Sequence, residues 1–306
     1  MSKALKSVIS IRDFDRQGIE DVLAVAAQME ERAQPRLLEG YVLGLMFIEP
    51  STRTRLSFAS AMLRLGGQVL DFGDPERSSF KKGESLSDAV RMVSGYCDVI
   101  AIRHPWEGAA RMTAEISGLP VINAGDGANQ HPTQTFLDLY TIQKTHGGIE
   151  GLSVGFVGDL RYSRTVHSLA GALSHFACRQ YFISPEILRV PSHVLEELAA
   201  RGVHYEEFRN PAEVLLQLDV LYCTRIQEER FADRLEYEQV KSSYRVDRAL
   251  LQQCGVKDSL RIMHPLPRVD ELSEDIDGTP YAVYFQQARN GIPVRQALLA
   301  MVLGKA

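Results

Sequence analysis

The sequence predicts an α/β protein of two doubly wound parallel-sheet domains, with the active site in the cleft between them. Short apolar runs alternate with longer amphipathic stretches along the chain, which is typical of parallel sheets covered by helices on both faces. The length of 306 residues corresponds to roughly two domains. A glycine-rich segment, "GGIEG" at residues 147–151, separates two such series. These three observations together favour two domains of similar size.

The first half begins with a buried strand. Residues 41–48, "YVLGLMFI", form an uninterrupted apolar run bounded by polar residues. A helix is expected over 54–66, where Leu56, Ala59 and Met62 recur at helical spacing and Gly66 ends the pattern. Further strands are expected at 68–72, 98–104 and 120–125, and further helices at 85–96, 107–118 and 133–148.

The second half repeats this alternation. Strands are expected at 152–159, 179–184, 219–225 and 260–266, and helices at 164–176, 193–202 and 290–304. We therefore place the first domain at residues 1–148 and the second at 149–286. The C-terminal helix, about residues 287–306, is expected to pack back on the first domain.

Composition excludes several classes of function. The formal net charge of −5 gives no basic field for nucleic acid. No apolar run approaches the roughly 18 residues of a membrane span, and "MSKALKSVISIRDF" lacks the apolar core of a signal peptide. Four cysteines are widely spaced without a CxxC pair, so we expect reduced, mostly buried thiols in a cytoplasmic protein.

Polar residues gather directly after the predicted strands. In the first half these segments are 49–55, 103–105 and 125–134, and in the second half they are 158–168, 224–230 and 264–268. Parallel sheets bind ligands at the carboxyl ends of their strands. The sequence therefore predicts that these segments line the cleft.

Ser51-Thr52-Arg53-Thr54 stands at a predicted helix start, where free N–H groups and the helix dipole favour an anion. Arginine adds a planar fork suited to phosphate oxygens. The alternative is that Ser51 or Thr52 only caps the helix and the arginines are solvated. Capping accounts for one hydroxyl but not for the whole set, so anion binding is the favoured interpretation.

"GDGANQHPTQ" places His131 and Gln134 just before a helix. A lone histidine is usually a packing residue, but the neighbouring Gln134 offers an amide that could recognise another amide. In the second half, Arg161 and Arg164 lie at a helix start and Arg225 and Gln227 at a strand end. A single arginine here would most often be a surface residue, whereas arginines at two strand ends suggest a substrate with two carboxylates.

The loop "SSFKKGES" at 78–85 carries Lys81 and Lys82, which as a rule would be a solvated charge run. The phosphate-loop, HExxH and GxSxG motifs are not found, Gly155 and Gly158 form only GxxG, and no cluster has metal-ligand spacing. We therefore expect no metal, no cofactor and no covalent intermediate, and chemistry that depends on positioning and fixed charges.

These motifs together closely resemble those of the aspartate/ornithine carbamoyltransferase family, over essentially the full chain. The matching segments are "STRTR", "KKGES", "RHPxEGAAR", "NAGDGxNQHPTQ", "GDLRYSRTVHS", "TRIQxER", "HPLPRVDE" and "YFQQxxNGIxxRQALL". Ornithine carbamoyltransferases have "HCLP" where this chain has "HPLP", and an "SMG" loop that is not found here. The second half therefore resembles the catalytic chains that use aspartate.

The resemblance implies transfer of the carbamoyl group of carbamoyl phosphate to the α-amine of L-aspartate, giving N-carbamoyl-L-aspartate and phosphate in pyrimidine biosynthesis. Its catalytic residues would be Arg53, Thr54, Arg103 and His131. Carbamoyl phosphate would also contact Ser51, Thr52, Gln134 and the backbone of Leu266 and Pro267. Aspartate would be held by Arg164, Arg225 and Gln227, and a neighbouring subunit of a homotrimer would lend Lys82 and Ser78, with Ser79 as the alternative hydroxyl.

Two rival functions stay open at this point. One is a carbamoyltransferase with a different acceptor, such as an N-substituted amino acid. The other is a non-catalytic binding subunit, which should have lost the phosphate or carboxylate residues that are all present here. The resemblance also leaves the assembly open among bare trimers, trimers joined by separate regulatory chains, and trimers beside an inactive dihydroorotase-like partner.

Overall fold

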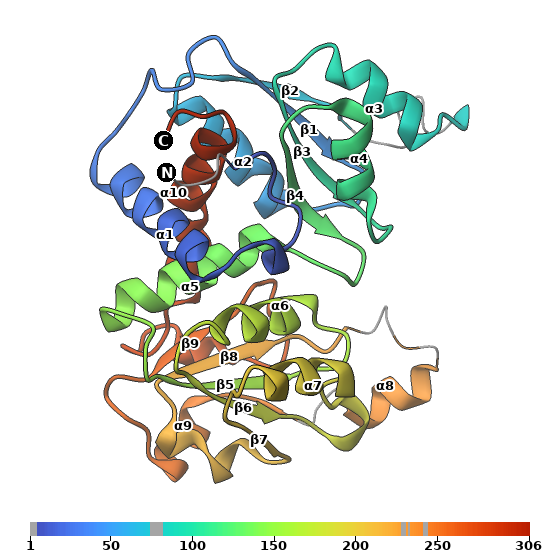
Figure 1. The fold of residues 1–306 in the computed structure, drawn as a ribbon. Helices are drawn as coiled ribbons and strands as arrows, with labels where there is room; N and C mark the ends of the chain where they lie inside the picture. Colours follow the sequence, from blue (N-terminus) through green and yellow to red (C-terminus); the bar gives the residue numbers. More distant parts are fainter. Residues whose placement is uncertain (1–4, 74–81, 228–230, 232, 241–243) are drawn as a thin grey trace. The chain divides into compact units, whose positions relative to one another are not determined.

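The computed structural model describes residues 5–73, 82–227, 231, 233–240 and 244–306. The chain divides into two compact units. The first unit comprises Met1–Tyr140 and Asn290–Ala306, and the second comprises Thr141–Arg289. Each unit contains its own parallel β-sheet with helices packed against it (Figure 1).

The first unit is built on a four-stranded sheet in the order β2-β1-β3-β4. Its strands are β1 (Val42–Phe47), β2 (Gln68–Asp71), β3 (Val99–His104) and β4 (Val121–Asp126), and all neighbours are parallel. Its helices are α1 (Arg16–Glu31), α2 (Thr52–Arg64), α3 (Leu86–Ser94), α4 (Ala109–Ser117) and most of α5 (Pro132–His146), with a short 3-10 turn η1 (Ile11–Asp13) before α1.

Helices cover both faces of this first sheet. Figure 1 shows α3 and α4 on one face and α1 and α2 on the other. On the α3–α4 face, Val90 and Ala110 pack with Met46, Ile100 and Ile102 of the strands in one apolar core. Burial on both faces explains why β1 and β3 read as continuous apolar runs.

The second unit has a five-stranded sheet in the order β7-β6-β5-β8-β9. Its strands are β5 (Ser153–Gly158), β6 (Arg179–Ile183), β7 (Tyr205–Phe208), β8 (Val220–Thr224) and β9 (Arg261–Met263), again all parallel. Its helices are α6 (Arg164–Leu173), α7 (Ser192–Ala200), α8 (Arg234–Val240) and α9 (Arg248–Cys254), with 3-10 turns η4 (Glu186–Leu188), η5 (Pro211–Glu213), η6 (Leu215–Gln217) and η8 (Glu274–Ile276).

The last helix, α10 (Tyr284–Val302), begins in the second unit and ends in the first. Its first residue, Tyr284, is buried with Leu251 and Ile262 in the core of the second sheet. Its later residues Val294 and Leu298 are fully buried, and they belong to the first unit.

The predicted fold class of two parallel-sheet α/β domains is confirmed, and every predicted strand is present. The structure adds α1, β7, α8 and α9 to the predicted set. Strand β7 reads "YEEF" and pairs only with β6 at the edge of its sheet. Its two central residues, Glu206 and Glu207, are charged and exposed, so it lacks the apolar run by which the other strands are identified.

Both sheets reverse their strand order once, and these reversals position the candidate site. In the first sheet the chain leaves β1 toward β2 and then returns to the other side of β1 with β3. In the second sheet β5 has β6 on one side and β8 on the other. In open α/β sheets the carboxyl ends of such a strand pair are the usual place for a ligand.

The cysteines behave as their spacing predicts. All four are free, and Cys97, Cys178 and Cys223 are buried. Burial raises the pKa of Cys97 to about 11 and that of Cys178 to about 12. None of the helices in the described part of the chain combines the length and hydropathy that crossing a bilayer requires.

Candidate active site

The loop after β1 leads into the N-terminus of α2, with Ser51 as the N-cap residue. Ser51 has extended backbone angles but its side chain makes no capping hydrogen bond. The capping interpretation of this hydroxyl is therefore wrong. Thr52 is exposed and Thr54 is buried, so the segment presents hydroxyl groups on both sides of the first turn. The first N–H groups of a helix also have no partner within the helix, which suits an anion.

Two arginines lie at this helix start, Arg53 in the first turn of α2 and Arg103 near the end of β3. Partial burial, together with the positive charge of Arg103, lowers the pKa of Arg53. Nη2 of Arg103 donates to Glu49 Oε1 at 2.5 Å and its Nη1 donates to the Ala124 carbonyl at 3.3 Å. Nε of Arg103 is buried and has no hydrogen-bond partner within the described part of the chain. An anion between the two guanidinium groups would relieve their repulsion and supply a hydrogen-bond acceptor for Nε of Arg103.

Arg55, two residues along the same helix, is placed differently. Its Nη2 lies 2.5 Å from Asp71 Oδ2 at the end of β2, and its Nε donates to the same oxygen at 2.7 Å. This guanidinium group is therefore already neutralised by a carboxylate. Of the two arginines in "STRTR", Arg55 is paired with a carboxylate, whereas Arg53 lies close to the positive charge of Arg103.

The loop between β4 and α5 is fixed by Asp126. Its carboxylate accepts hydrogen bonds from the Gly108 and Gln130 backbone at 2.9 and 3.0 Å, and from the Asn123 and Asn129 amides at 2.9 and 3.0 Å. Asp126 is 2% exposed, so these four donors hold it in a buried position. The next turn of chain, which carries His131, is thereby fastened to the end of β4.

His131 and Gln134 are both buried at the start of α5. His131 Nδ1 lies 3.4 Å from Thr133 Oγ1. Gln134 Nε2 donates to Asp138 Oδ1 at 2.8 Å, one helical turn later. A carboxylate can only accept, so the amide nitrogen must face Asp138 and the amide oxygen is left as an acceptor. Gln134 is thus suited to a ligand N–H group.

In the second unit, Arg164 is the first residue of α6, and Arg225 and Gln227 follow β8. All three are half-buried. Asp159, at the end of β5, is fully buried and accepts from the Tyr162 and Gln227 backbone amides at 2.9 and 3.4 Å. Burial raises the pKa of Asp159, and the amide hydrogen bonds oppose that shift only in part. This carboxylate joins the loop after β5 to the loop after β8.

Gly158 lets β5 and β8 approach closely just before these loops. Its φ is +120°, and a Cβ atom there would lie 2.1 Å from the Thr224 carbonyl oxygen. A side chain at this position would push the two strand ends apart. Glycine at 158 is therefore part of how the Arg164 and Arg225 loops are brought together.

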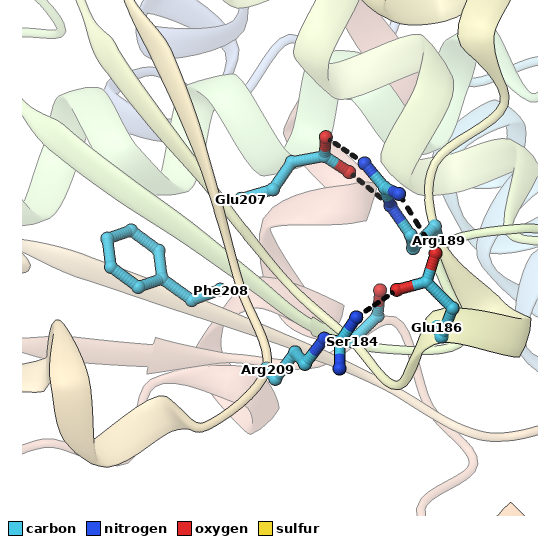
Figure 2. A pocket seen from close by; sticks show the side chains of 6 residues that line it. All are labelled: Ser184, Glu186, Arg189, Glu207, Phe208 and Arg209. Atoms are coloured by element: carbon cyan, nitrogen blue, oxygen red, sulfur yellow. Dashed lines mark hydrogen bonds and ion pairs between the residues drawn. The ribbon is translucent and has the colours of Figure 1, made fainter.

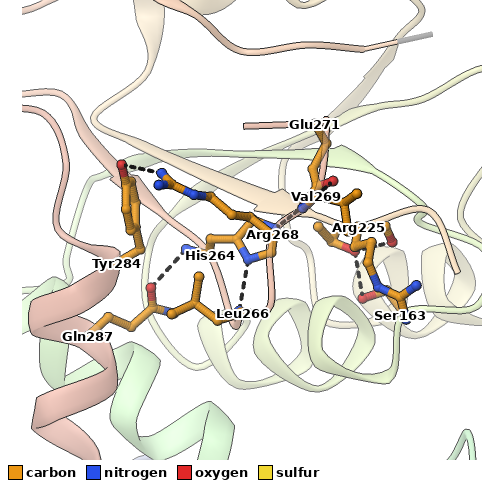
Figure 3. A network of polar contacts seen from close by, with 10 residues as sticks. Ser163, Arg225, His264, Leu266, Arg268, Val269, Glu271, Tyr284 and Gln287 are labelled. Atoms are coloured by element: carbon orange, nitrogen blue, oxygen red, sulfur yellow. Dashed lines mark hydrogen bonds and ion pairs between the residues drawn. The ribbon is translucent and has the colours of Figure 1, made fainter. Parts of the chain in front are cut away.

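The loop after β9 forms the polar network drawn in Figure 3. His264 lies at its centre and contacts Leu266, Glu271 and Gln287. Leu266 has a φ of 58° and is the one non-glycine residue with a positive φ in the described ranges. Left-handed backbone costs a non-glycine residue about 1 kcal/mol or more, so the surrounding contacts must hold this conformation. The Leu266–Pro267 peptide is cis.

One surface pocket lies apart from these groups. It is lined by Ser184, Glu186, Arg189, Glu207, Phe208 and Arg209. Figure 2 shows its two arginines paired with its two glutamates. Because its charges are already satisfied and it contains none of the predicted residues, we do not include it in the candidate site.

The remaining predicted residues are partly outside the described ranges. Ser78, its alternative Ser79, and Lys81 lie in 74–81, which the structure does not describe. Lys82 is described and exposed. No cluster of potential metal ligands occurs among the described residues.

Several side chains around the site were not predicted from the sequence. They are Glu49, Asp126, Asp138, Asp159, His264 and Glu271. Only Asp138 had a local signal, because it stands four residues after Gln134 on one helix face. The others meet their partners either across separate segments, as Glu49 meets Arg103, or through the folding of an irregular loop, as His264 meets Glu271.

The fold and these two polar edges define a class: a two-domain α/β protein that can hold one anion beside β1 and β3 and another beside β5 and β8. The chain belongs to the aspartate/ornithine carbamoyltransferase family. Residues 6–144 match the carbamoyl-P binding domain of that family and residues 150–302 match its Asp/Orn binding domain. The resemblance found in the sequence motifs is therefore confirmed.

Individual relatives are similar over nearly the whole chain. An aspartate carbamoyltransferase catalytic subunit of Methanopyrus kandleri is 57% identical over 99% of both chains. One from Thermococcus onnurineus is 54% identical over 98% of this chain and 97% of its own. The solved catalytic subunit of M. jannaschii aspartate transcarbamoylase is 50% identical, with a TM-score of 0.90 over 98% of both chains.

A Trypanosoma cruzi aspartate transcarbamoylase, solved in complex with carbamoyl phosphate and aspartate, is 38% identical to this chain. Its TM-score is 0.89, and the match covers 96% of this chain and 94% of that one. Since identity and fold agree over almost the full length, the family assignment applies to both units.

Proposed function

We propose that this chain transfers the carbamoyl group of carbamoyl phosphate to the α-amine of L-aspartate, giving N-carbamoyl-L-aspartate and phosphate. The observation that carries the proposal is the pair of polar loop clusters at the strand-order reversals of the two sheets. One presents hydroxyls and two mutually repelling arginines, and the other presents arginines from two strand ends. The near full-length similarity to aspartate carbamoyltransferase catalytic subunits supports the same reaction.

The first unit binds carbamoyl phosphate in this proposal. Ser51, Thr52, Arg53 and Thr54 contact the phosphate, where the helix start and the Arg53–Arg103 pair favour a dianion. Gln134 accepts from the carbamoyl amide through its free oxygen, and the carbonyls of Leu266 and Pro267 accept its second N–H.

The second unit binds L-aspartate. Arg164 and Arg225 each take a carboxylate, and the Gln227 amide adds a hydrogen bond. Two guanidinium groups recognise two carboxylates better than an amine, so a dicarboxylic acceptor is favoured over ornithine. Both substrates are anions, and the fixed arginines offset the repulsion of bringing them together.

The reaction needs no metal or covalent intermediate. The aspartate amine attacks the carbonyl carbon, forming a C–N bond and a tetrahedral species with a negative oxygen. Thr54, Arg103 and His131 donate to that oxygen, and one such donor contributes about 10²–10³-fold in rate. The intermediate then collapses, the C–O bond to phosphate breaks, and the departing phosphate takes the proton from the amine. Holding both reactants in fixed orientation supplies much of the remaining acceleration.

The working unit in this proposal is a cytoplasmic homotrimer in which Lys82 and Ser78 reach a neighbouring site. Exposed leucines of the first unit support an interface: Leu56 and Leu63 on α2 are 62% and 61% exposed. They stand seven residues apart on α2, a spacing that places them on one face of a helix, and an exposed apolar face commonly marks a contact between subunits. A separate regulatory chain is compatible with the name catalytic subunit that the relatives carry. Light scattering after size-exclusion chromatography measures the number of subunits.

The test of the reaction is a panel of acceptors. The purified chain is incubated with carbamoyl phosphate and L-aspartate, L-ornithine or N-substituted amino acids, and products are identified by mass while phosphate release is measured. Product with L-aspartate alone is expected. Product with another acceptor would overturn the roles of Arg164, Arg225 and Gln227. No product from a folded trimer would favour a non-catalytic binding subunit.

A further inference from the structure

We propose that His264 and Glu271 are a positioning pair that aims the carbonyl groups of Leu266 and Pro267 at the amide of carbamoyl phosphate. This inference rests on the proposed function, because it concerns how one substrate group is recognised. Neither side chain needs to touch the substrate. Both act through the backbone of the loop after β9 (Figure 3).

The hydrogen bonds of His264 assign its proton. Nδ1 accepts from the Leu266 N–H at 2.8 Å, so it carries no proton of its own. Nε2 therefore bears the proton and donates to Glu271 Oε1 at 2.7 Å. A neutral imidazole has one donor and one acceptor, and here both are used. The Glu271 carboxylate thus selects the tautomer that can hold Leu266.

Glu271 also holds the far end of the loop. The Val269 N–H donates to both of its oxygens, at 3.1 and 3.2 Å. His264 and Glu271 are 1% and 8% exposed, so little water competes with these bonds. Burial acts to raise the pKa of Glu271, but the hydrogen bond from His264 and the backbone amide hydrogen bonds, that of Val269 among them, outweigh it, and the pKa is lowered. The carboxylate therefore stays ionised as an acceptor at neutral pH.

The pair is itself anchored to a helix. The backbone N–H of His264 donates to Gln287 Oε1 at 2.8 Å, and Gln287 is a buried residue of α10. Support therefore runs from α10 through His264 to Leu266, and from Glu271 to Val269. Leu266 and Pro267 lie between these two fixed points.

This bracing matters because Leu266 adopts a left-handed conformation that its own side chain disfavours. Released from the Leu266–His264 bond, the backbone would relax and rotate its carbonyl groups. A carbamoyl amide has two N–H groups, and an unpaired N–H in a closed site costs binding energy. Loss of the pair should therefore weaken the binding of ligands that carry the amide, and it should leave the binding of phosphate alone unchanged.

The test uses two probes, phosphonoacetamide, which carries the amide, and inorganic phosphate, which lacks it. Isothermal titration calorimetry measures both affinities for wild type, His264→Ala, His264→Asn and Glu271→Gln. We expect His264→Ala to weaken phosphonoacetamide at least 10-fold and phosphate less than twofold. His264→Asn keeps an acceptor oxygen near the position of Nδ1 but cannot reach Glu271, so a loss of about three- to tenfold is expected. Glu271→Gln still accepts from Nε2, and its loss should stay below threefold.

Gln180→Ala is the matched control for lost stability. Gln180 is a fully buried polar residue near the start of β6, and its side chain donates to the Ala170 carbonyl. This variant should lower the melting temperature without changing either affinity. Wild-type phosphonoacetamide affinity in folded His264→Ala would overturn the proposal, as would an equal loss for both probes. If His264→Ala does not fold, unchanged phosphonoacetamide binding by His264→Asn overturns it instead.

The inference and the proposed function can fail separately. A wild-type chain that turns over no carbamoyl phosphate with any acceptor contradicts the proposed function. An active wild type whose His264 variants keep their preference for phosphonoacetamide over phosphate contradicts only the positioning pair.

Discussion

The two sheets reverse their strand order in the same way, yet the groups at the two reversals are different. Beside β1 and β3, the positive charges of Arg53 and Arg103 repel each other at the start of α2, where the Ser51 side chain makes no capping hydrogen bond. Beside β5 and β8, a glycine allows close approach of the strands and a buried Asp159 ties the two loops together. The strand order determines where a ligand can bind, whereas the few residues after each strand determine which ligand it is.

The arginines at the two reversals also differ in their burial and in the hydrogen bonds that hold them. Arg103 donates hydrogen bonds to Glu49 and to the Ala124 carbonyl, and its Nε is buried. Arg164 and Arg225 are half-buried at the ends of two loops. We therefore expect changes in the first unit to affect the rate of the chemical step, and changes in the second unit to affect acceptor binding.

The largest effect should come from Arg53→Ala. In the proposed reaction Arg53 faces the phosphate, which gains negative charge as the C–O bond breaks, so losing this donor is expected to lower kcat about 10²–10³-fold. Steady-state kinetics with both substrates at saturation measures it. Arg55→Ala is the matched control on the same helix, since Arg55 is paired with Asp71, and it should change kcat less than about threefold. Equal losses in the two variants would contradict the special role of Arg53.

Gly158→Ala would break the close approach of β5 and β8. A Cβ atom 2.1 Å from the Thr224 carbonyl, at a φ of +120°, should reduce the free energy of unfolding by on the order of 3 kcal/mol. Urea unfolding measures the change. Gly171→Ala, inside α6 with nothing within 4 Å of the new atom, should be neutral or stabilising. A tolerated Gly158→Ala would mean that the strand ends can separate without cost.

Arg225→Ala would sharpen the assignment of substrates to units. Removing a charged hydrogen-bond donor to a carboxylate should raise KM for L-aspartate about 10–100-fold, because such bonds contribute about 1.5–3 kcal/mol. Binding of inorganic phosphate should stay within about twofold. Arg161→Ala is the control, since Arg161 is exposed and donates to the Ile187 carbonyl. A large loss of phosphate affinity in Arg225→Ala would argue against separate substrate sites.

The smallest effect concerns the ion pair of Asp277 with Arg268, which follows the β9 loop in the second unit. The hydrogen bond from Arg268 lowers the pKa of Asp277, and partial burial opposes this shift. A carboxyl group whose folded pKa lies below its unfolded value stabilises the fold above the unfolded value, and that stability is lost as the pH falls through the folded one.

Asp277→Asn should therefore lower stability at pH 7, by about 1 kcal/mol or less because the pair is partly exposed. The difference from wild type should vanish as the pH falls below the folded pKa of Asp277. Thermal unfolding across this range measures it. A difference that persists in acid would mean that Asp277 acts by packing and not by its charge.

Much of the fold could be predicted from the sequence because buried parallel strands read as apolar runs. β1, β3, β5 and β8 were identified in this way, and so were the polar segments after them. The edge strand β7 was missed because the two central residues of "YEEF" are charged and exposed. The order of strands within each sheet depends on contacts between distant segments, so periodicity alone cannot supply it.

The candidate site was predictable only in its ligand-facing part. Arginines and hydroxyls at helix starts attract notice by their type, as Arg53 and Arg164 do. Their supports, such as Glu49 for Arg103 and Glu271 for His264, are ordinary acidic residues whose partners lie elsewhere in the chain or across a folded loop. Whether Ser51 caps its helix is also a matter of geometry that the residue type does not decide.

Helix α10 has a consequence for how the chain is made. Residues 290–306 belong to the first unit, and Leu298 and Leu299 are fully buried. The first 140 residues therefore emerge from the ribosome without the helix that completes their core. At about 5–20 residues per second, translation of the intervening segment leaves that apolar surface uncovered for roughly ten to thirty seconds. During synthesis the second unit can finish folding first, although its residues are translated later than most of the first unit.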